Sequence, residues 1–231
     1  MYKFTSRFNS SDRQQLLSKS QQCLWLEEGK LGMEYLTKTR QFSDKVIKLF
    51  GLGYIPHYVK NPLAGRIIFP LYDASENLIA LTTRHMSSNE TFLPVYWHEQ
   101  YEKSFYVYGC NIAKKFIREK GWCVVTEGQC DVIQLHNHGI FNAVGLCGTS
   151  LSSVQLSTVL RYCDKIIVLL DSDVNKAGQR AADKIIGSTH GYKVESVMLP
   201  MGMDPDDIIK KYGTTKLIRV MNEKIENLRA S

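Results

Sequence analysis

Residues 124–128 read Val-Val-Thr-Glu-Gly, and residues 166–173 read Ile-Ile-Val-Leu-Leu-Asp-Ser-Asp. Short apolar runs rich in Val and Ile predict strands that are buried on both faces of a parallel sheet. Each run ends in carboxylates, because Glu127 closes the first and Asp171 and Asp173 close the second. The carboxyl ends of such strands form the ligand crevice of the sheet. We therefore expect these three side chains at one edge.

Three carboxylates at one edge would repel one another unless a divalent cation lay between them. Asp171 and Asp173 are two residues apart, so in an extended segment their side chains face the same way. Hard oxygen ligands suit Mg²⁺, which binds one or two carboxylates and leaves room for phosphate oxygens. The pattern predicts metal-dependent phosphate chemistry, with Mg²⁺ as the cofactor and Mn²⁺ as its alternative.

Further acidic residues follow the same or neighbouring strands. Asp131 is one turn into the helix after Glu127, where it can support the helix N-terminus or the metal shell. Asp204 and Asp206 flank Pro205 after the last predicted strand. They can cap the next helix, with the proline in its first turn, or take part in metal binding, and the two roles are compatible.

Two other motifs have an ordinary structural explanation beside a functional one. Gly148 and Thr149 precede a predicted helix, where backbone amides bind a phosphate or simply cap the helix. The string His136-Asn137-His138 spells the letters of a nuclease motif. It lies at the end of a short helix and runs into Gly139, so we interpret it as a solvated helix end.

Strands and helices alternate in the second half of the chain, which predicts βαβ units over a parallel sheet. The strands are expected at 122–126, 141–146, 165–170 and 193–199, the helices around 112–117 and at 129–136, 151–162 and 177–187, and a helical tail at 204–228. The first half differs. Residues 10–50 have a helical pattern, and 67–71 with 78–81 predict a hairpin.

Basic charge is concentrated near the N-terminus. Of the 29 basic and 23 acidic residues, 11 and 5 lie in residues 1–66, so the rest carries 18 of each. A basic front half suits a polyanion, although a solvated helical surface has the same composition. Aromatic residues crowd 96–108 and either stack on unpaired bases or fill a half-buried sheet.

The six cysteines form no Cys-x-x-Cys pair, so we expect reduced thiols and no structural zinc. No apolar stretch is long enough for a membrane span, and the N-terminus lacks the apolar core of a signal peptide. We therefore expect a cytoplasmic protein with no membrane partner.

The pattern Glu127-Gly128-x-x-Asp131 followed by Asp171-x-Asp173 resembles the TOPRIM domain of bacterial-type primases, topoisomerases and certain nucleases. Outside it, residues 35–54 and 66–71 resemble the helical start and one strand of the DnaG-type primase catalytic core. Further matches follow in the family's order: Lys103 before Tyr108-Gly109, Gly148-Thr149-Ser150, Ala177-Gly178 and Asp204-Pro205-Asp206.

This resemblance implies an α/β fold, in which an α+β N-terminal subdomain precedes a TOPRIM-type parallel sheet and a short helical tail. We expect a basic primase-core subdomain at 1–115, the TOPRIM domain at 116–203 and the tail at 204–231. The implied activity is template-directed synthesis of short RNA primers on single-stranded DNA from ribonucleoside triphosphates, a nucleotidyl transfer by a DNA-directed RNA polymerase.

The resemblance also implies residue roles. Glu127, Asp171 and Asp173 would be catalytic and hold the metal ions, with Asp131, Asp204 and Asp206 nearby. The residues implied to contact template or nucleotide are Arg66, Arg84, Lys103, Gly148, Thr149 and Lys176.

The chain also departs from the family's usual form. It shows neither the family's zinc ribbon nor its helicase-interacting domain, which is typical of a minimal phage or mobile-element primase and equally of a catalytic fragment of a longer primase. We therefore expect a replicative helicase or a separate template-recognition subunit as a partner. Two alternatives remain: a TOPRIM nuclease, and a non-catalytic accessory protein of replication that binds single-stranded DNA.

Overall fold

The predicted alternation of strands and helices is present in the computed structural model, which describes residues 8–86, 94–148, 150–170, 177–189, 192–197, 199–200 and 203–230. By its contacts the chain divides into two units. The first unit comprises Met1–Tyr72 and Glu76–Tyr101, and the second comprises Asp73–Ser75 and Glu102–Ser231. This division reports which residues contact one another. The domain bounds from the sequence refer instead to the modules of a protein family, so the domains at 1–115, 116–203 and 204–231 stay a prediction.

The second unit is built on a parallel sheet of four strands in the order β6-β5-β7-β8. Their bounds are β5 Trp122–Thr126, β6 Ala143–Gly145, β7 Lys165–Val168 and β8 Lys193–Ser196. Strand β5 pairs with β6 on one side and with β7 on the other, both in parallel. The central strands are β5 and β7, as their continuous apolar sequence predicts.

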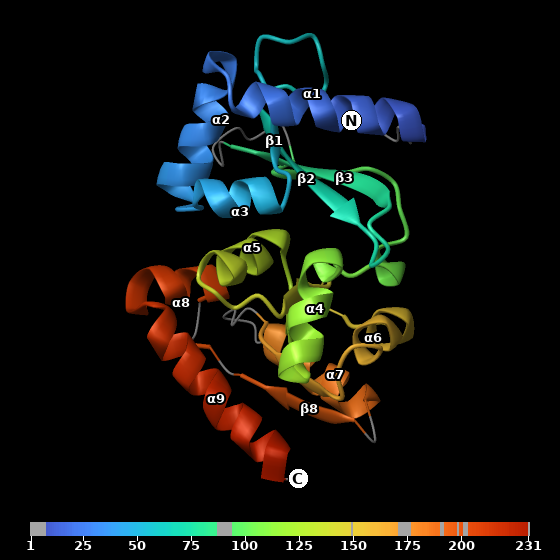
Figure 1. Ribbon diagram of the computed structural model, residues 1–231, viewed down its shortest axis with the longest axis vertical. Helices are drawn as coiled ribbons and strands as arrows, with labels where there is room; N and C mark the ends of the chain where they lie inside the picture. The colour runs from blue at the N-terminus through green and yellow to red at the C-terminus, as the bar shows by residue number, and fades with distance from the viewer. Residues whose placement is uncertain are drawn as a thin grey trace. The chain divides into compact units, whose positions relative to one another are not determined.

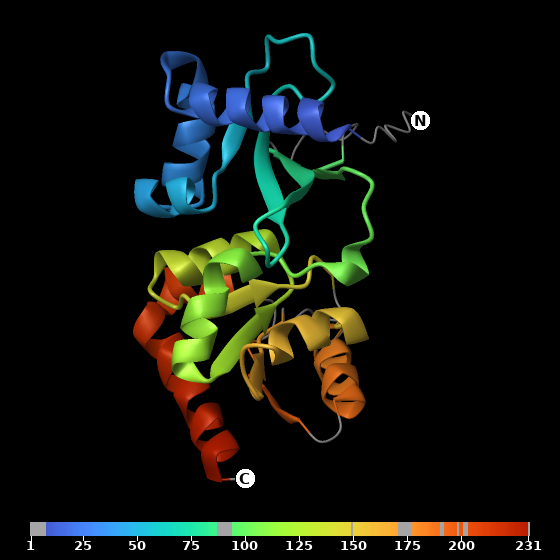
Figure 2. The same ribbon diagram turned by 45° about the vertical axis from the view of Figure 1, so that its right-hand side comes forward.

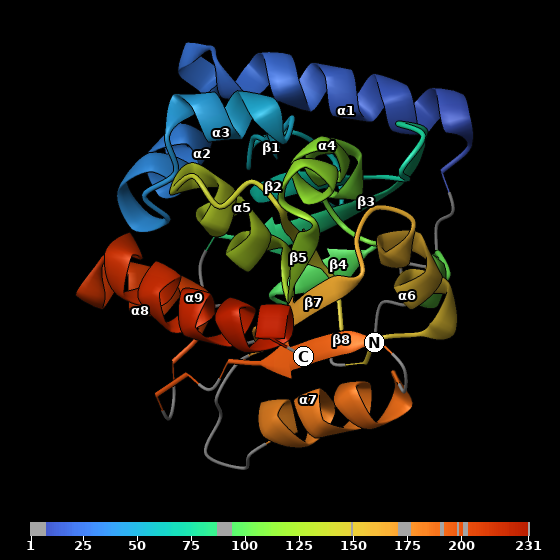
Figure 3. The same ribbon diagram turned by 60° about the horizontal axis from the view of Figure 1, so that its bottom comes forward.

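Helices cover both faces of this sheet, because alternate residues of a strand point to opposite faces. Cys123 and Val125 pack on one face in a core shared with α4 (Cys110–Lys120), α6 (Ser153–Leu160) and α7 (Ala177–Ser188). Val124 packs on the other face in a core shared with α5 (Gln129–Asn137), α8 (Pro205–Tyr212) and α9 (Thr214–Ala230). Figure 3 shows α7 and α9 on opposite sides of β8.

The predicted helical tail at 204–228 consists of two helices, α8 and α9. Gly213 separates them with a φ of 79°, a left-handed conformation that is costly for residues with a Cβ. Both helices are red in Figure 2. Among the described residues, no helix is both long and apolar enough to cross a lipid bilayer.

The first unit has an antiparallel sheet in the order β1-β2-β3-β4. The strands are β1 Gly53–Ile55, β2 Arg66–Tyr72, β3 Leu78–His85 and β4 Tyr96–His98. The helix α1 (Ser10–Leu24) contacts β1, β2 and β3 and lies across them in Figure 1. The predicted hairpin is confirmed as the β2–β3 pair.

Short helical segments follow α1: η1 Glu27–Gly29, α2 Lys30–Glu34, the π-helical η2 Tyr35–Thr39 and α3 Asp44–Leu49. Ser43 caps α3, since its side chain accepts a hydrogen bond from the Val46 amide.

The whole chain therefore has the predicted α/β class, with an α+β first unit, a parallel α/β second unit and a helical tail.

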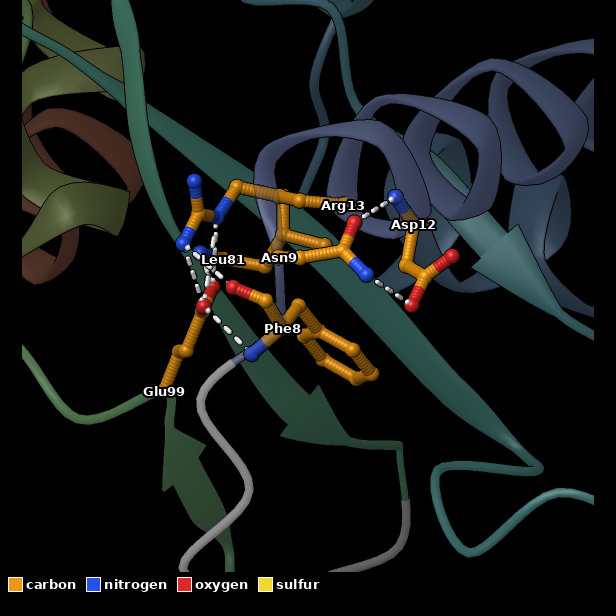
Figure 4. A network of polar contacts seen from close by, with 6 residues as sticks. All are labelled: Phe8, Asn9, Asp12, Arg13, Leu81 and Glu99. Atoms are coloured by element: carbon orange, nitrogen blue, oxygen red, sulfur yellow. Dashed lines mark hydrogen bonds and ion pairs between the residues drawn. The ribbon is translucent and has the colours of Figure 1, made fainter.

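A buried carboxylate fixes α1 to the first sheet (Figure 4). The Glu99 side chain is fully buried, and Arg13 donates to it from Nη2 at 2.6 Å and from Nε at 2.9 Å. The backbone amides of Phe8 and Leu81 each donate to the same carboxylate at 3.1 Å. The carboxylate thus joins the start of α1, Arg13 and strand β3.

We predict that Glu99→Ala destabilises the protein by about 3–5 kcal/mol, because it leaves the largely buried Arg13 without its carboxylate and the Leu81 amide without an acceptor. Urea unfolding measures this change. The control is Glu34→Ala, which removes an exposed i,i+4 pair with Lys38 and should shift the midpoint far less. Equal shifts in the two variants would contradict the prediction.

The interpretation of 136–138 as a helix end is confirmed, since α5 ends at Asn137 and Gly139 follows with a φ of 84°. The expected solvation of this end is wrong for His136, which is only 2% exposed. Its Nε2 lies 2.9 Å from the Ala143 carbonyl on β6 and must donate, because a carbonyl only accepts. Burial lowers the pKa of His136 to about 4.

A buried neutral histidine makes stability depend on pH. In the unfolded chain His136 binds a proton below about pH 6.5, its ordinary pKa. In the folded chain it binds this proton only near pH 4. The contribution of His136 to stability should therefore be constant above about pH 6.5 and fall as the pH drops towards 4, by up to about 3 kcal/mol. Urea unfolding at several pH values in this window measures the effect. His136→Gln should make the free energy of unfolding less dependent on pH, whereas His57→Gln, at an exposed position, should leave this pH dependence unchanged. A steep fall retained in His136→Gln would refute the assignment.

Candidate functional site

Two neighbouring parallel strands, each followed in the sequence by predicted site residues, end at one edge of the second unit's sheet. Val125 of β5 is in register with Val168 of β7, and the Leu169 amide donates to the Val125 carbonyl at 2.8 Å. Both strands therefore end at the same edge, where Glu127 is half-buried immediately after β5. Asp171 and Asp173, predicted after β7, lie outside the described residues.

Asp131 stabilises the turn that follows Glu127. It is 7% exposed in the first turn of α5, and its Oδ2 accepts a hydrogen bond from the Gly128 amide at 3.0 Å. A Cβ at position 128 would lie only 3.0 Å from that oxygen. A glycine therefore permits the close approach, and the predicted helix-supporting role of Asp131 is confirmed. Its metal-shell role stays a prediction.

Asp204 caps α8, as one of its two proposed roles requires. Its side chain accepts from the Asp207 amide at 2.7 Å, and Asp207 accepts in return from the Asp204 amide at 3.4 Å. Pro205 opens the helix. The side chain of Asp206 lies outside the described part of the structure. The metal roles of Asp204 and Asp206 therefore stay predictions.

Within the described residues, which leave out Asp171 and Asp173, no three His, Cys, Asp or Glu side chains are grouped so as to hold a metal ion. The donor types nevertheless fit Mg²⁺, because Glu127, Asp131 and Asp204 all supply oxygens and no sulfur or imidazole. The predicted phosphate contacts Thr149 and Lys176 also lie outside the described residues.

Arg66 is buried in the first unit. It is 3% exposed on β2 and donates to the carbonyls of Pro94 at 2.7 Å and Val95 at 3.3 Å. Burial lowers the pKa of this guanidinium. These bonds attach the segment before β4 to strand β2, which is a structural role, and the predicted contact with template or nucleotide stays a prediction.

Arg84, on β3, is held by two tyrosines. Its Nε donates to the Tyr35 hydroxyl at 2.8 Å and its Nη1 to the Tyr96 hydroxyl at 2.5 Å. The guanidinium also lies 4.8 Å from the centroid of the Tyr96 ring. Arg40 donates to the same Tyr35 hydroxyl at 3.0 Å. Two cations that share one phenol make a concentrated positive charge, which suits phosphate oxygens.

Sequence reasoning missed Tyr35, Tyr96 and Arg40 as a group, because the residues are distant in the chain. The aromatic segment from 96 onwards was predicted either to stack on bases or to fill a sheet. Tyr96 stacks on His98 with ring planes 3° apart, and the Phe8 ring meets Trp97 edge-on. Tyr96 and Trp97 therefore pack against other residues of the first unit, which agrees with the second alternative.

Lys103 begins the short helix η3 (Lys103–Phe105) of the second unit and is half-buried. Gly148 is also half-buried, and a Cβ at this position would meet no atom within 4 Å. The segments that contain the two residues share one hydrogen-bonding partner, Gln155, which sequence reasoning missed. The signal for it was the capping-box pattern Ser152-x-x-Gln155 at the start of α6.

Comparison with known proteins agrees with this architecture. A family model described as Toprim-like matches residues 124–209. The DNA primase of Aquifex aeolicus is 28% identical over 228 residues, covering 84% of this chain and 45% of the relative. The DNA primase of Campylobacter jejuni is 34% identical over 165 residues, covering 70% of this chain and 27% of the relative.

A solved structure of a DnaG primase catalytic domain bound to single-stranded DNA superposes with a TM-score of 0.78 at 23% identity, covering 93% of this chain and 80% of the other. At this identity the likeness establishes the fold. The chain spans less than half the length of the two curated relatives. Together the sequence matches and the shared fold identify this chain as a relative of the catalytic core of DnaG-type DNA primases, with a Toprim-like domain over residues 124–209.

Proposed function

We propose that this chain is the catalytic part of a DNA primase, which synthesises short RNA primers on single-stranded DNA. The observation that carries the proposal is the parallel pairing of β5 with β7, which brings the segment before Asp171 to the edge where Glu127 follows β5. The similarity to curated DNA primases supports primer synthesis as the phosphate chemistry proposed for this edge.

In this proposal Glu127, Asp171 and Asp173 hold Mg²⁺, or Mn²⁺ in its place, with Asp131, Asp204 and Asp206 in supporting positions. When bound, the ion would neutralise negative charge on the triphosphate and on the attacking and leaving oxygens. Glu127 orients the 3′-hydroxyl and can accept its proton. The bond between Asp131 and the Gly128 amide keeps the turn after Glu127 in one conformation, which reduces reorganisation during the reaction.

Positively charged groups bind the polyanionic substrates. Arg84 and Arg40, both attached to the Tyr35 hydroxyl, are suited to phosphates of the template strand. Arg66 supports the same sheet from its buried position. The triphosphate of the incoming ribonucleotide is proposed to bind to four other residues, Lys103, Gly148, Thr149 and Lys176. Contacts with phosphates make binding strongly salt-dependent and nearly independent of sequence.

Template choice then requires further contacts. We propose a replicative helicase or a separate template-recognition subunit as the partner that supplies them, in the cytoplasm of a bacterium or of a phage-infected cell. The solved relative bound to single-stranded DNA supports the template class.

The proposal is tested by incubating the chain with single-stranded DNA, labelled ribonucleotides and Mg²⁺ or Mn²⁺. Labelled oligoribonucleotides are the expected product. Shortening of the template would instead identify a TOPRIM nuclease, and retention of DNA without chemistry would identify an accessory protein.

We predict that Glu127→Gln lowers primer synthesis by about 100-fold or more, because the amide neither carries the charge for metal binding nor accepts a proton. Binding to single-stranded DNA and the urea midpoint should stay unchanged. The matched control is Glu223→Gln, whose side chain is 66% exposed on α9 and which should retain full activity. Full activity in Glu127→Gln would refute the assignment of the catalytic edge.

A further inference from the structure

Gln155 joins three segments of the second unit through one buried amide. The residue is 1% exposed in the first turn of α6. Its Nε2 lies within hydrogen-bonding distance of three carbonyl oxygens, those of Lys103 at 3.2 Å, Tyr106 at 2.8 Å and Leu146 at 3.1 Å. Its Oε1 accepts from the Ser152 amide at 3.0 Å. The amide is therefore fully used, with two hydrogens shared among three acceptors.

Two further contacts reinforce the same connection. The Ser152 hydroxyl donates to the Ser104 carbonyl at 2.5 Å and accepts from the backbone amide of Gln155 at 3.1 Å. Tyr108 and Gly145 exchange backbone hydrogen bonds of 2.8 and 3.0 Å. Residues 103–108 are thereby attached both to the start of α6 and to the end of strand β6.

The two segments that Gln155 joins contain proposed nucleotide contacts. Lys103 is in one, and Leu146 lies two residues before Gly148 in the other, next to the carboxyl end of β6. Backbone carbonyls bonded to one side chain cannot move independently, so the distance between the two segments is set by Gln155. Its own side chain is enclosed and has no hydrogen left for a ligand.

We propose that Gln155 is a positioning residue that sets Lys103 relative to the Gly148 turn and thereby determines the affinity for the incoming nucleotide. This inference rests on the proposed function. A glutamine is required because the position needs a donor for carbonyls and an acceptor for the Ser152 amide at once. Glutamate lacks the donor, and methionine of similar length lacks both.

The coupling itself is tested by hydrogen exchange in Gln155→Met. We expect exchange to rise about tenfold or more in peptides covering 102–109 and 144–148, because three carbonyls in these segments lose the side-chain donor that they share. The matched control is Gln134→Met, which removes an equally buried amide on α5 whose Nε2 has no hydrogen-bond partner among the described residues. Similar exchange in the two variants would overturn the proposal.

Ser152→Ala is a milder variant, in case Gln155→Met folds poorly. It removes the bond to the Ser104 carbonyl and the acceptor for the Gln155 backbone amide, and it keeps the side-chain amide of Gln155. We expect a smaller rise of exchange in the 102–109 peptide. Unchanged exchange in this peptide would count against the proposed attachment.

The functional effect is tested by the kinetics of primer synthesis. Gln155→Met should raise KM for ribonucleotides about tenfold with kcat changed less than about twofold, since misplacement of a binding group weakens affinity more than chemistry. Combined with Lys103→Ala, the substitution should add little further loss, because Gln155 acts through Lys103. Additive effects would overturn the proposal. A wild-type chain that makes no primers would refute the proposed function instead, and hydrogen exchange would still decide the coupling.

Discussion

The parallel pairing of β5 with both β6 and β7 is the constraint on which the second unit depends. Each of these strands is followed by a helix, and both faces of the sheet are covered by apolar cores. Parallel strands end on the same side, so the segments after β5, β6 and β7 leave the sheet at one edge. Segments that are distant in the sequence therefore begin at the same edge of the sheet, as a consequence of strand direction and strand order.

Buried polar groups then fix the loops that the apolar cores leave undetermined. Asp131 holds the turn after β5, Gln155 holds the segments around Lys103 and Leu146, and Glu99 attaches α1 to the first sheet. Each is a side chain bonded to backbone amides or carbonyls, which would be costly to bury without a partner. Hydrophobic burial thus determines the architecture, and a few polar side chains determine the positions of the loops.

Much of the fold was predictable because its signals are local. Strand β5 has the predicted bounds 122–126. Ser43 caps α3 within the stretch predicted to be helical, and Asp204 and Pro205 open α8 as an acidic cap followed by proline should. Signals that depend on distant partners were missed. The buried Arg66 donates to carbonyls nearly thirty residues later in the chain, and the buried His136 donates to the Ala143 carbonyl, which belongs to a different element.

The sequence by itself determined the alternation of elements, the parallel class of the second sheet and the order of its carboxylates, because apolar periodicity and capping residues act within one or two turns of chain. Only the tertiary structure decided the strand order β6-β5-β7-β8, the attachment of Arg84 to Tyr35 and Tyr96, and the three-way bond of Gln155. These depend on which segments meet in space. That choice is set by the combined burial of many residues, which no short stretch of sequence contains.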